Sequence, residues 1–248
     1  MKTSSPENPK PPSPKSILLI GPPGGGKTTL AMQFPNVCVF DCDENLDGPE
    51  KFLRAGPNKK LMFSYFTPRT SDNGKINDIG LCFDILMREL DAIKDNQSIK
   101  TVVIDSLTAI NEFVIRKLLK QQTRTEMEAR DWIPFKSSFY QLIFSKLRAL
   151  GKTTICTVHE TIVTEPNPKD MMNPIIAGYR PSVQGSITDY FGAFFTDVWR
   201  CEARPAPLGK QKFVVVTQKT SKSDLKNSCL MPSEIEAEWE KVNDYLKL

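Results

Sequence analysis

Nine consecutive residues carry the clearest chemistry in this chain: Gly21, Pro22, Pro23, Gly24, Gly25, Gly26, Lys27, Thr28 and Thr29. They match the pattern G-x-x-x-x-G-K-[ST], in which glycines allow successive backbone N–H groups to turn toward phosphate oxygens. A helix that begins directly behind such a loop adds partial positive charge at the same place. The pattern predicts that Lys27 binds the β- and γ-phosphates of a nucleotide and that the Thr28 hydroxyl is a ligand of Mg²⁺.

Two apolar segments farther along the chain end on carboxylates. The segment 101–105 closes on Asp105, and the segment 37–41 is followed by an acidic turn that contains Asp43, Glu44 and Asp47. Ligands in open parallel sheets gather at the carboxyl ends of strands, and Mg²⁺ requires oxygen donors. We therefore expect Asp105 to be an acidic ligand of the metal. The acidic turn has two interpretations, a part of the site or a solvated turn that caps a helix.

The only histidine, His159, follows the apolar segment 153–158. A single histidine in a chain is usually structural, but this one is predicted at a strand end, in the same layer as Asp43 and Asp105. We interpret it as a functional residue.

Composition limits the class of protein. The chain has 248 residues, with 33 basic and 29 acidic side chains and a net charge of +4, so any contact with nucleic acid must be local. There is neither an apolar signal core at the N-terminus nor an apolar run of membrane-spanning length. The six cysteines lack C-x-x-C spacing and are expected to be free thiols. We expect a soluble cytoplasmic protein without a membrane contact.

The remaining elements place these residues in an α/β domain. Strands are predicted at 17–20, 37–41, 61–66, 101–105, 153–158, 197–201 and 212–217, the last two as a hairpin. Helices are predicted behind the glycine-rich loop, from Asp78 as cap through 93, at 107–122 and at 131–150. Ser233 and Glu236 form a predicted capping box for a terminal helix. The predicted organisation is a disordered Pro-rich tail (1–15), a core (16–222) and a C-terminal extension with a helix (223–248).

The segment 161–184 has four prolines and little periodicity. We predict a long loop, which inside a compact domain is usually functional or disordered.

Taken together, these residues resemble the RecA-like ATPases, most closely the small core-only members encoded by phages beside recombination and single-strand annealing functions. The resemblance extends over about residues 16 to 222 and includes the glycine-rich loop, the acidic strand ends and the sequence 158–160. It implies a twisted, mainly parallel sheet flanked by helices, with a C-terminal β-hairpin. It also implies ATP and Mg²⁺ as ligands.

The resemblance also suggests catalytic roles. RecA-type proteins place a water-polarising glutamate just after the second strand; here Asp43 stands at that position and Glu44 one residue on, so the assignment is divided between them. His159 corresponds to a residue that senses the γ-phosphate. Lys219 and Lys222 are similar in placement to cationic fingers that reach the nucleotide of a neighbouring subunit, although solvated lysines in a turn are an equal alternative.

Two segments resemble DNA-binding loops. The segment 161–184, with Lys169 and Arg180, is similar to the second such loop, and the segment 121–130, with Arg124 and Arg130, to the first.

The implied function is ATP-dependent binding of single-stranded DNA in recombination, annealing or repair, in a bacterial host cell if the gene is a phage gene. A DNA-stimulated ATPase of this type is expected to form a homo-oligomer, either a filament or a ring, and to work beside a single-stranded DNA-binding protein. The alternatives are a ring helicase or its loader, and a nucleotide-binding regulatory module without DNA.

Overall fold

The computed structural model describes residues 14–56, 62–71, 73–168, 170, 172–207 and 211–246. The predicted disordered tail lies almost entirely outside the described residues, as does Lys169. Within the described ranges, no helix combines the length and the apolar character needed to cross a bilayer.

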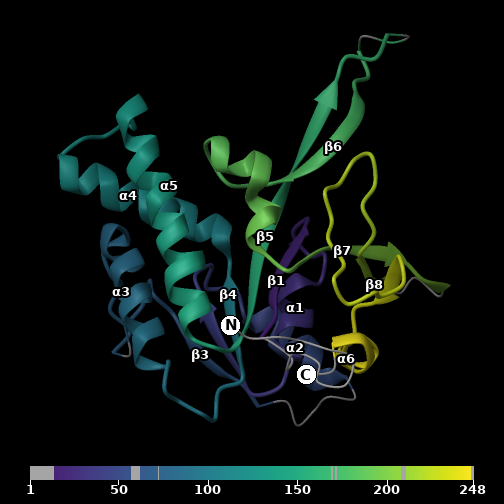
Figure 1. Cartoon of the computed structure of the whole chain (residues 1–248), viewed down its shortest axis with the longest axis horizontal. Coiled ribbons are helices and arrows are strands. Elements are labelled where there is room, and N and C mark those ends of the chain that lie inside the picture. The colour runs from purple at the N-terminus through teal and green to yellow at the C-terminus, as the bar shows by residue number, and fades with distance from the viewer. Residues whose placement is uncertain are drawn as a thin grey trace, which may run out of the picture.

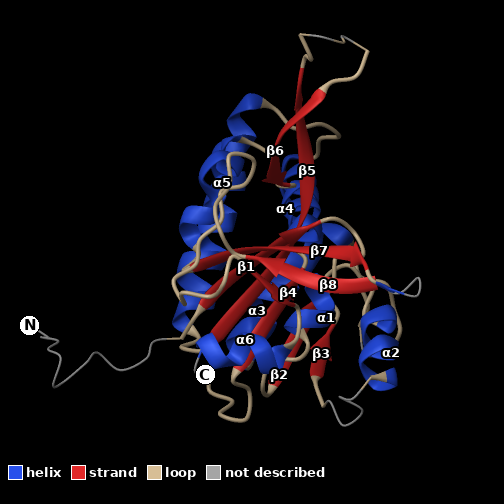
Figure 2. Ribbon diagram, turned by 90° about the vertical axis from the view of Figure 1, so that its right-hand side faces the viewer, coloured by secondary structure: helices blue, strands red, loops and turns tan. Residues whose placement is uncertain are grey.

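A mixed, mainly parallel β-sheet forms the centre of the molecule (Figures 1 and 2). The strand order is β3-β2-β4-β5-β1-β7-β8-β9; all pairs from β3 to β7 are parallel, and β8 and β9 are antiparallel additions. The bounds are β1 Ser16–Gly21, β2 Val37–Asp41, β3 Ser64–Phe66, β4 Thr101–Asp105, β5 Thr153–Glu165, β6 Ile175–Pro181, β7 Asp197–Pro205, β8 Gln211–Val216 and β9 Glu234–Glu236. The predicted fold class, including the β7–β8 hairpin, is confirmed.

Helices cover both faces of the sheet. Their bounds are α1 Lys27–Ala31, α2 Asp47–Ala55, α3 Ile79–Ala92, α4 Leu107–Gln122, α5 Trp132–Tyr140 and α6 Trp239–Leu246, with single-turn or irregular segments η1 Ala129–Asp131, η2 Gln141–Leu147 and η3 Ser186–Phe194. The predicted helix at 131–150 is realised as α5 continuing into the π-helical η2. Asp78 caps α3 as predicted, since its carboxylate accepts a hydrogen bond from the Gly80 N–H.

Apolar side chains along the buried strands point alternately to the two faces of the sheet, and each face is covered by its own set of helices. In β1, Leu18 and Ile20 belong to the apolar cluster with α3, α4 and α5, whereas Ile17 and Leu19 belong to the cluster with α1, α2 and α6. Because side chains on a strand point alternately to opposite faces, an uninterrupted apolar run is the pattern of a strand covered on both sides. Because β1 lies between β5 and β7, the glycine-rich loop that follows it leaves the sheet at its centre.

The predicted loop at 161–184 is wrong. Strand β5 continues six residues past His159 to Glu165 and pairs with β6 in an antiparallel hairpin that projects from the body (Figures 1 and 2). We call residues 160–165 and 175–181 the arm. Its prolines do not prevent pairing, since Pro166, Pro168 and Pro174 lie between the two strands and Pro181 ends β6, where prolines are tolerated.

The predicted capping box at Ser233 and Glu236 is also wrong. Residues Glu234–Glu236 form β9, which pairs with β8, and the terminal helix α6 begins only at Trp239. Strand pairing with an exposed edge outweighed the local capping pattern. Val242 and Leu246 of α6 are nevertheless buried in the apolar cluster on that face of the sheet.

Candidate functional site

The glycine-rich loop connects β1 to α1 and is pressed against β7. A Cβ atom at Gly21 would lie 2.2 Å from the carbonyl oxygen of Cys201, so no other residue fits there. Gly26 has φ 88°, in the left-handed region, and a Cβ atom on it would lie 2.9 Å from the Phe213 ring. The loop thus owes its path to glycine at both positions, which lets its backbone N–H groups surround an anion.

Lys27 lies at the base of this loop and is 6% exposed. Its ammonium donates hydrogen bonds to the carbonyl oxygens of Gly21 (2.9 Å) and Pro22 (2.8 Å). Burial lowers the pKa of Lys27, and the negative charges of Asp105 and Asp43 are among those that oppose this shift. A phosphate group bound at the loop would place negative charge beside this desolvated ammonium and so favour its charged form.

Asp105, at the end of β4, is joined to the loop through hydroxyl groups. The Thr28 Oγ1 donates to Asp105 Oδ2 at 2.8 Å, and the Thr157 hydroxyl on β5 donates to Oδ1. Burial raises the pKa of Asp105, whereas these two hydrogen bonds oppose the rise. Thr157 was not among the predicted site residues, although a polar residue inside the buried part of a strand is a usable signal.

Hydroxyl and carboxylate oxygens of Thr28 and Asp105 fit Mg²⁺, which prefers oxygen donors and usually takes only one or two protein carboxylates together with substrate phosphates and water. The described residues contain no group of three or more His, Cys, Asp or Glu side chains that could enclose a metal by themselves.

The two candidates for the water-polarising carboxylate, Asp43 and Glu44 in the acidic turn after β2, line different pockets. Asp43 lines the same pocket as the glycine-rich loop, together with Asp105 and His159. Glu44 has a left-handed backbone, with φ 55°, and its carboxylate accepts a hydrogen bond from the Thr70 hydroxyl at 2.5 Å. It lines a different pocket. The structure therefore brings Asp43, and not Glu44, to the phosphate loop.

His159 lies on β5 opposite Gly21 of β1 in the parallel register. Its Nε2 is 4.0 Å from Asp43 Oδ2, and its backbone N–H donates to the Thr108 hydroxyl at the start of α4. Burial lowers the pKa of His159, and the nearby charge of Lys27 lowers it further. The imidazole is therefore neutral near pH 7 and able to donate or accept one hydrogen bond.

These side chains enclose a cavity of about 460 Å³, within the range of ligand pockets in proteins. Residues Pro23 to Thr29 line it directly, whereas Gly21 and Pro22 contribute through the carbonyl groups that hold Lys27.

The other predicted site residues lie outside this cavity. Lys219 pairs with Asp224 at 2.6 Å and Lys222 is exposed, so neither reaches the nucleotide site of its own chain. Arg124 forms ion pairs with Glu128 (2.6 Å) and Asp131 (2.7 Å).

The two remaining described candidates are both exposed. Arg130 pairs with Glu128 at 3.0 Å, and Arg180 lies on the arm. Their DNA contacts remain predictions.

Asp41, which ends β2 just before the acidic turn, allows a test of electrostatics beside the site. It is 4% exposed, and burial raises its pKa to about 6. A carboxyl group whose pKa is higher in the folded state stabilises the fold at low pH, and this contribution is lost as the pH rises through 6. The isosteric Asp41→Asn variant is expected to be more stable than the wild type at pH 8 by about 3 kcal/mol, and nearly equal at pH 4. Urea unfolding at both pH values measures this difference, and an equal difference at the two would contradict the assignment.

A strand-loop-helix phosphate site at the centre of a parallel sheet, with a carboxylate at the end of β4, which β5 separates from the strand that carries the loop, defines a P-loop ATPase. The chain belongs to a family described as an AAA domain, whose model matches residues 13–229.

Two solved structures match the chain at low sequence identity. A KaiC-like protein of the hyperthermophilic archaeon Pyrococcus horikoshii OT3 is 18% identical with a TM-score of 0.47, covering 90% of this chain and 85% of that protein. An ATPase of the type III secretion system of pathogenic bacteria is 14% identical with a TM-score of 0.39, covering 76% of this chain and 52% of that protein. No curated protein sequence matches.

Proposed function

We propose that this protein is a DNA-stimulated ATPase that couples ATP binding and hydrolysis to the binding of single-stranded DNA, in recombination, annealing or repair in the bacterial cytoplasm. One observation carries the proposal: a single strand, β5, passes through the nucleotide site at Thr157 and His159 and continues without interruption into the arm. A change at the phosphate end of this strand would thus be transmitted to the projecting hairpin.

Contacts at the base of the arm support such coupling. Arg200 of β7 forms two hydrogen bonds with Glu160, at 2.8 and 2.9 Å, and its guanidinium lies 4.2 Å from the ring centroid of Tyr179 on β6. Glu160 directly follows His159. The arm is therefore held to the ATPase body through a buried ion pair next to the predicted γ-phosphate sensor.

Each residue of the site has a role in hydrolysis. Lys27 would exchange its two loop carbonyls for phosphate oxygens, and the loop N–H groups would hold the rest of the triphosphate. Thr28 and Asp105 would hold Mg²⁺, which supplies positive charge opposite the developing negative charge of the transferred phosphoryl group. Asp43 would orient the attacking water, and neutral His159 would bind near the γ-phosphate.

The arm has the features of a surface for flexible nucleic acid. Ile162, Ile175 and Ile176 are 54%, 47% and 38% exposed, and Arg180 supplies a positive charge beside them. Proteins that bind single strands combine a positively charged groove for phosphates with side chains, mostly aromatic, that contact the bases; on the arm the exposed isoleucines would make the apolar contact.

Assembly into a homo-oligomer, either a filament or a ring, is part of the proposal. Lys219 and Lys222 lie in a loop whose Lys222 carbonyl accepts the Tyr179 N–H at 2.8 Å, so this loop is attached to the arm. In an oligomer they would reach the nucleotide of the neighbouring subunit. A single-stranded DNA-binding protein is the expected partner on DNA.

The proposal is tested by the ATPase rate with and without single-stranded DNA. We expect the wild type to be stimulated, and the double variant Ile162→Ser/Ile175→Ser to lose about 5-fold or more of its DNA affinity because apolar contacts with bases are removed. Ile133→Ser, at an exposed position on α5, is the matched control and should behave as the wild type. A wild-type rate that does not respond to DNA, with no DNA binding by the arm, would leave a regulatory nucleotide-binding module as the better explanation.

A further inference from the structure

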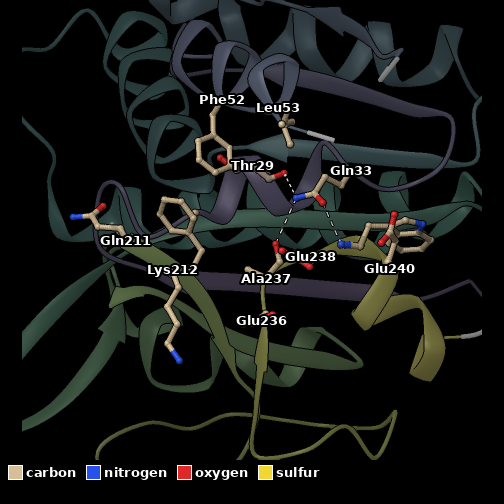
Figure 3. A pocket seen from close by; sticks show the side chains of 14 residues that line it. Thr29, Gln33, Phe52, Leu53, Gln211, Lys212, Glu236, Ala237, Glu238 and Glu240 are labelled. Atoms are coloured by element: carbon tan, nitrogen blue, oxygen red, sulfur yellow. Dashed lines mark hydrogen bonds between the residues drawn. The ribbon is translucent and has the colours of Figure 1, made fainter. Parts of the chain in front are cut away.

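A second cavity of about 280 Å³ adjoins the phosphate pocket (Figure 3). The two cavities share Gly26, Thr29, Phe52 and Phe213, so a ligand bound at the loop can extend from one into the other. The far side of the second cavity is formed by residues 236–240, which connect β9 to α6. We call this segment the C-terminal wall. It lies two hundred positions from the glycine-rich loop in sequence, and nothing in the loop pattern predicts that it would approach the nucleotide site.

The C-terminal wall is attached to α1 through one side chain. The Gln33 amide nitrogen donates to the carbonyl oxygens of Thr29 (3.0 Å) and Ala237 (3.5 Å), and its amide oxygen accepts the Trp239 N–H at 3.2 Å. Figure 3 shows Gln33 between Thr29 and Ala237. Gln33 is buried, at 9% exposed, and each of its polar atoms has a partner on a backbone. A change at Gln33 would therefore loosen the wall and, on the side of the loop, remove only its hydrogen bond to the Thr29 carbonyl.

Two aromatic rings mark the passage between the cavities. Phe52 of α2 and Phe213 of β8 meet edge to face, with centroids 5.5 Å apart. Phe213 packs against Gly26, and Phe52 is 56% exposed although it is a large apolar side chain. An exposed aromatic ring beside a phosphate site is suited to the face of a heterocyclic base, which gains stacking energy there.

We propose that the second cavity holds the base and ribose of the bound nucleoside triphosphate, and that Gln33 is a positioning residue that keeps the C-terminal wall in place around them. The inference rests on the proposed nucleotide-binding function and deepens it. The polar atoms of Gln33 and the Ala237 and Trp239 backbone groups that it binds are already paired with each other. The surface offered to a base is therefore mainly apolar and includes the rings of Phe52, Phe213 and Trp239. Stacking area then decides the order of affinity, which is purine, then pyrimidine, then a triphosphate without a base.

The fluorescence of Trp239 can report whether the second cavity is occupied, because Trp239 belongs to the C-terminal wall and is one of only three tryptophans in the chain. We expect ATP with Mg²⁺ to change the Trp239 fluorescence, CTP to do so at higher concentration, and inorganic tripolyphosphate to compete for the loop without the change. The Trp239→Phe variant identifies the signal by its disappearance. Equal fluorescence responses to ATP and tripolyphosphate would overturn the proposal.

Variants of Gln33 separate positioning from folding. Gln33→Met keeps the side-chain volume but removes all three hydrogen bonds, and we expect about 10-fold weaker ATP binding with tripolyphosphate binding unchanged. Because the phosphate site is intact, KM for ATP should rise while kcat stays within about 2-fold. Gln33→Glu keeps the acceptor for the Trp239 N–H but places a carboxylate against two carbonyl oxygens, so it should weaken ATP binding at least as much. Asp244→Ala, an exposed position on α6 away from the cavity, is the matched control.

The outcomes distinguish this inference from the function on which it rests. Equal losses of ATP and tripolyphosphate affinity in Gln33→Met would show a general structural role and overturn the proposal, while the ATPase assignment would stand. Wild-type protein that binds neither ligand would overturn both.

Discussion

The Lys27→Ala variant is expected to lose ATP hydrolysis entirely and to bind ATP at least about 100-fold more weakly. The buried ammonium of Lys27 is the charged group that the structure presents at the base of the loop, bound to two loop carbonyls that a phosphate would replace. Steady-state phosphate release and titration with a fluorescent ATP analogue measure the two effects. Lys51→Ala, an exposed lysine on α2, serves as the control for a change of net charge.

A second measurement separates this loss from misfolding. Because burial already lowers the pKa of Lys27, removal of this desolvated charge is not expected to destabilise the free protein. The thermal unfolding midpoint without nucleotide should stay the same or rise, whereas the increase that ATP produces in the wild type should vanish. Full turnover by a folded Lys27→Ala protein would contradict the assignment of the site.

Asp43→Asn is expected to reduce kcat by about 100-fold or more while ATP binding changes little. Asp43 lines the phosphate pocket and lies 4.0 Å from His159, in a position to orient a water molecule, and an amide cannot accept its proton. Single-turnover hydrolysis, measured together with ATP affinity, distinguishes a chemical defect from a binding defect.

Glu44→Gln is the matched comparison, since it makes the same chemical change one residue away. The Glu44 carboxylate is bound to Thr70 and lines another pocket, so its kcat should remain within about 3-fold of the wild type. The opposite ranking of these two variants would transfer the water-orienting role to Glu44.

The elements that dictate their own structure locally could be predicted from the sequence. The apolar runs that end at Asp41 and Asp105 became buried parallel strands, because only a strand covered on both faces tolerates such runs. The glycine-rich loop matched its structure because each constraint, a left-handed φ at Gly26 and close backbone contact at Gly21, excludes other residues.

Long-range partners explain what could not be predicted. The arm looked like a loop because prolines lie between its strands and at the end of β6, and only the pairing of β5 with β6 makes it a hairpin. Glu234–Glu236 formed a strand because they pair with the edge of β8, a tertiary contact that their own sequence does not encode. Thr157 and Gln33 acquire their roles only when strands and helix ends distant in sequence come together.

The uneven pairing of β5 divides the strand into two parts of different local stability. Up to His159 it is paired with β1, and up to Cys156 also with β4, whereas from Glu160 onward its strand partner is β6 alone. Backbone amides in the first part share the free energy of global unfolding, while those in the arm can open in a smaller, independent event. The arm can therefore become more rigid around a ligand at little cost to the core. If the arm binds DNA as proposed, the conformational entropy lost there would couple the affinity for DNA to the affinity for nucleotide.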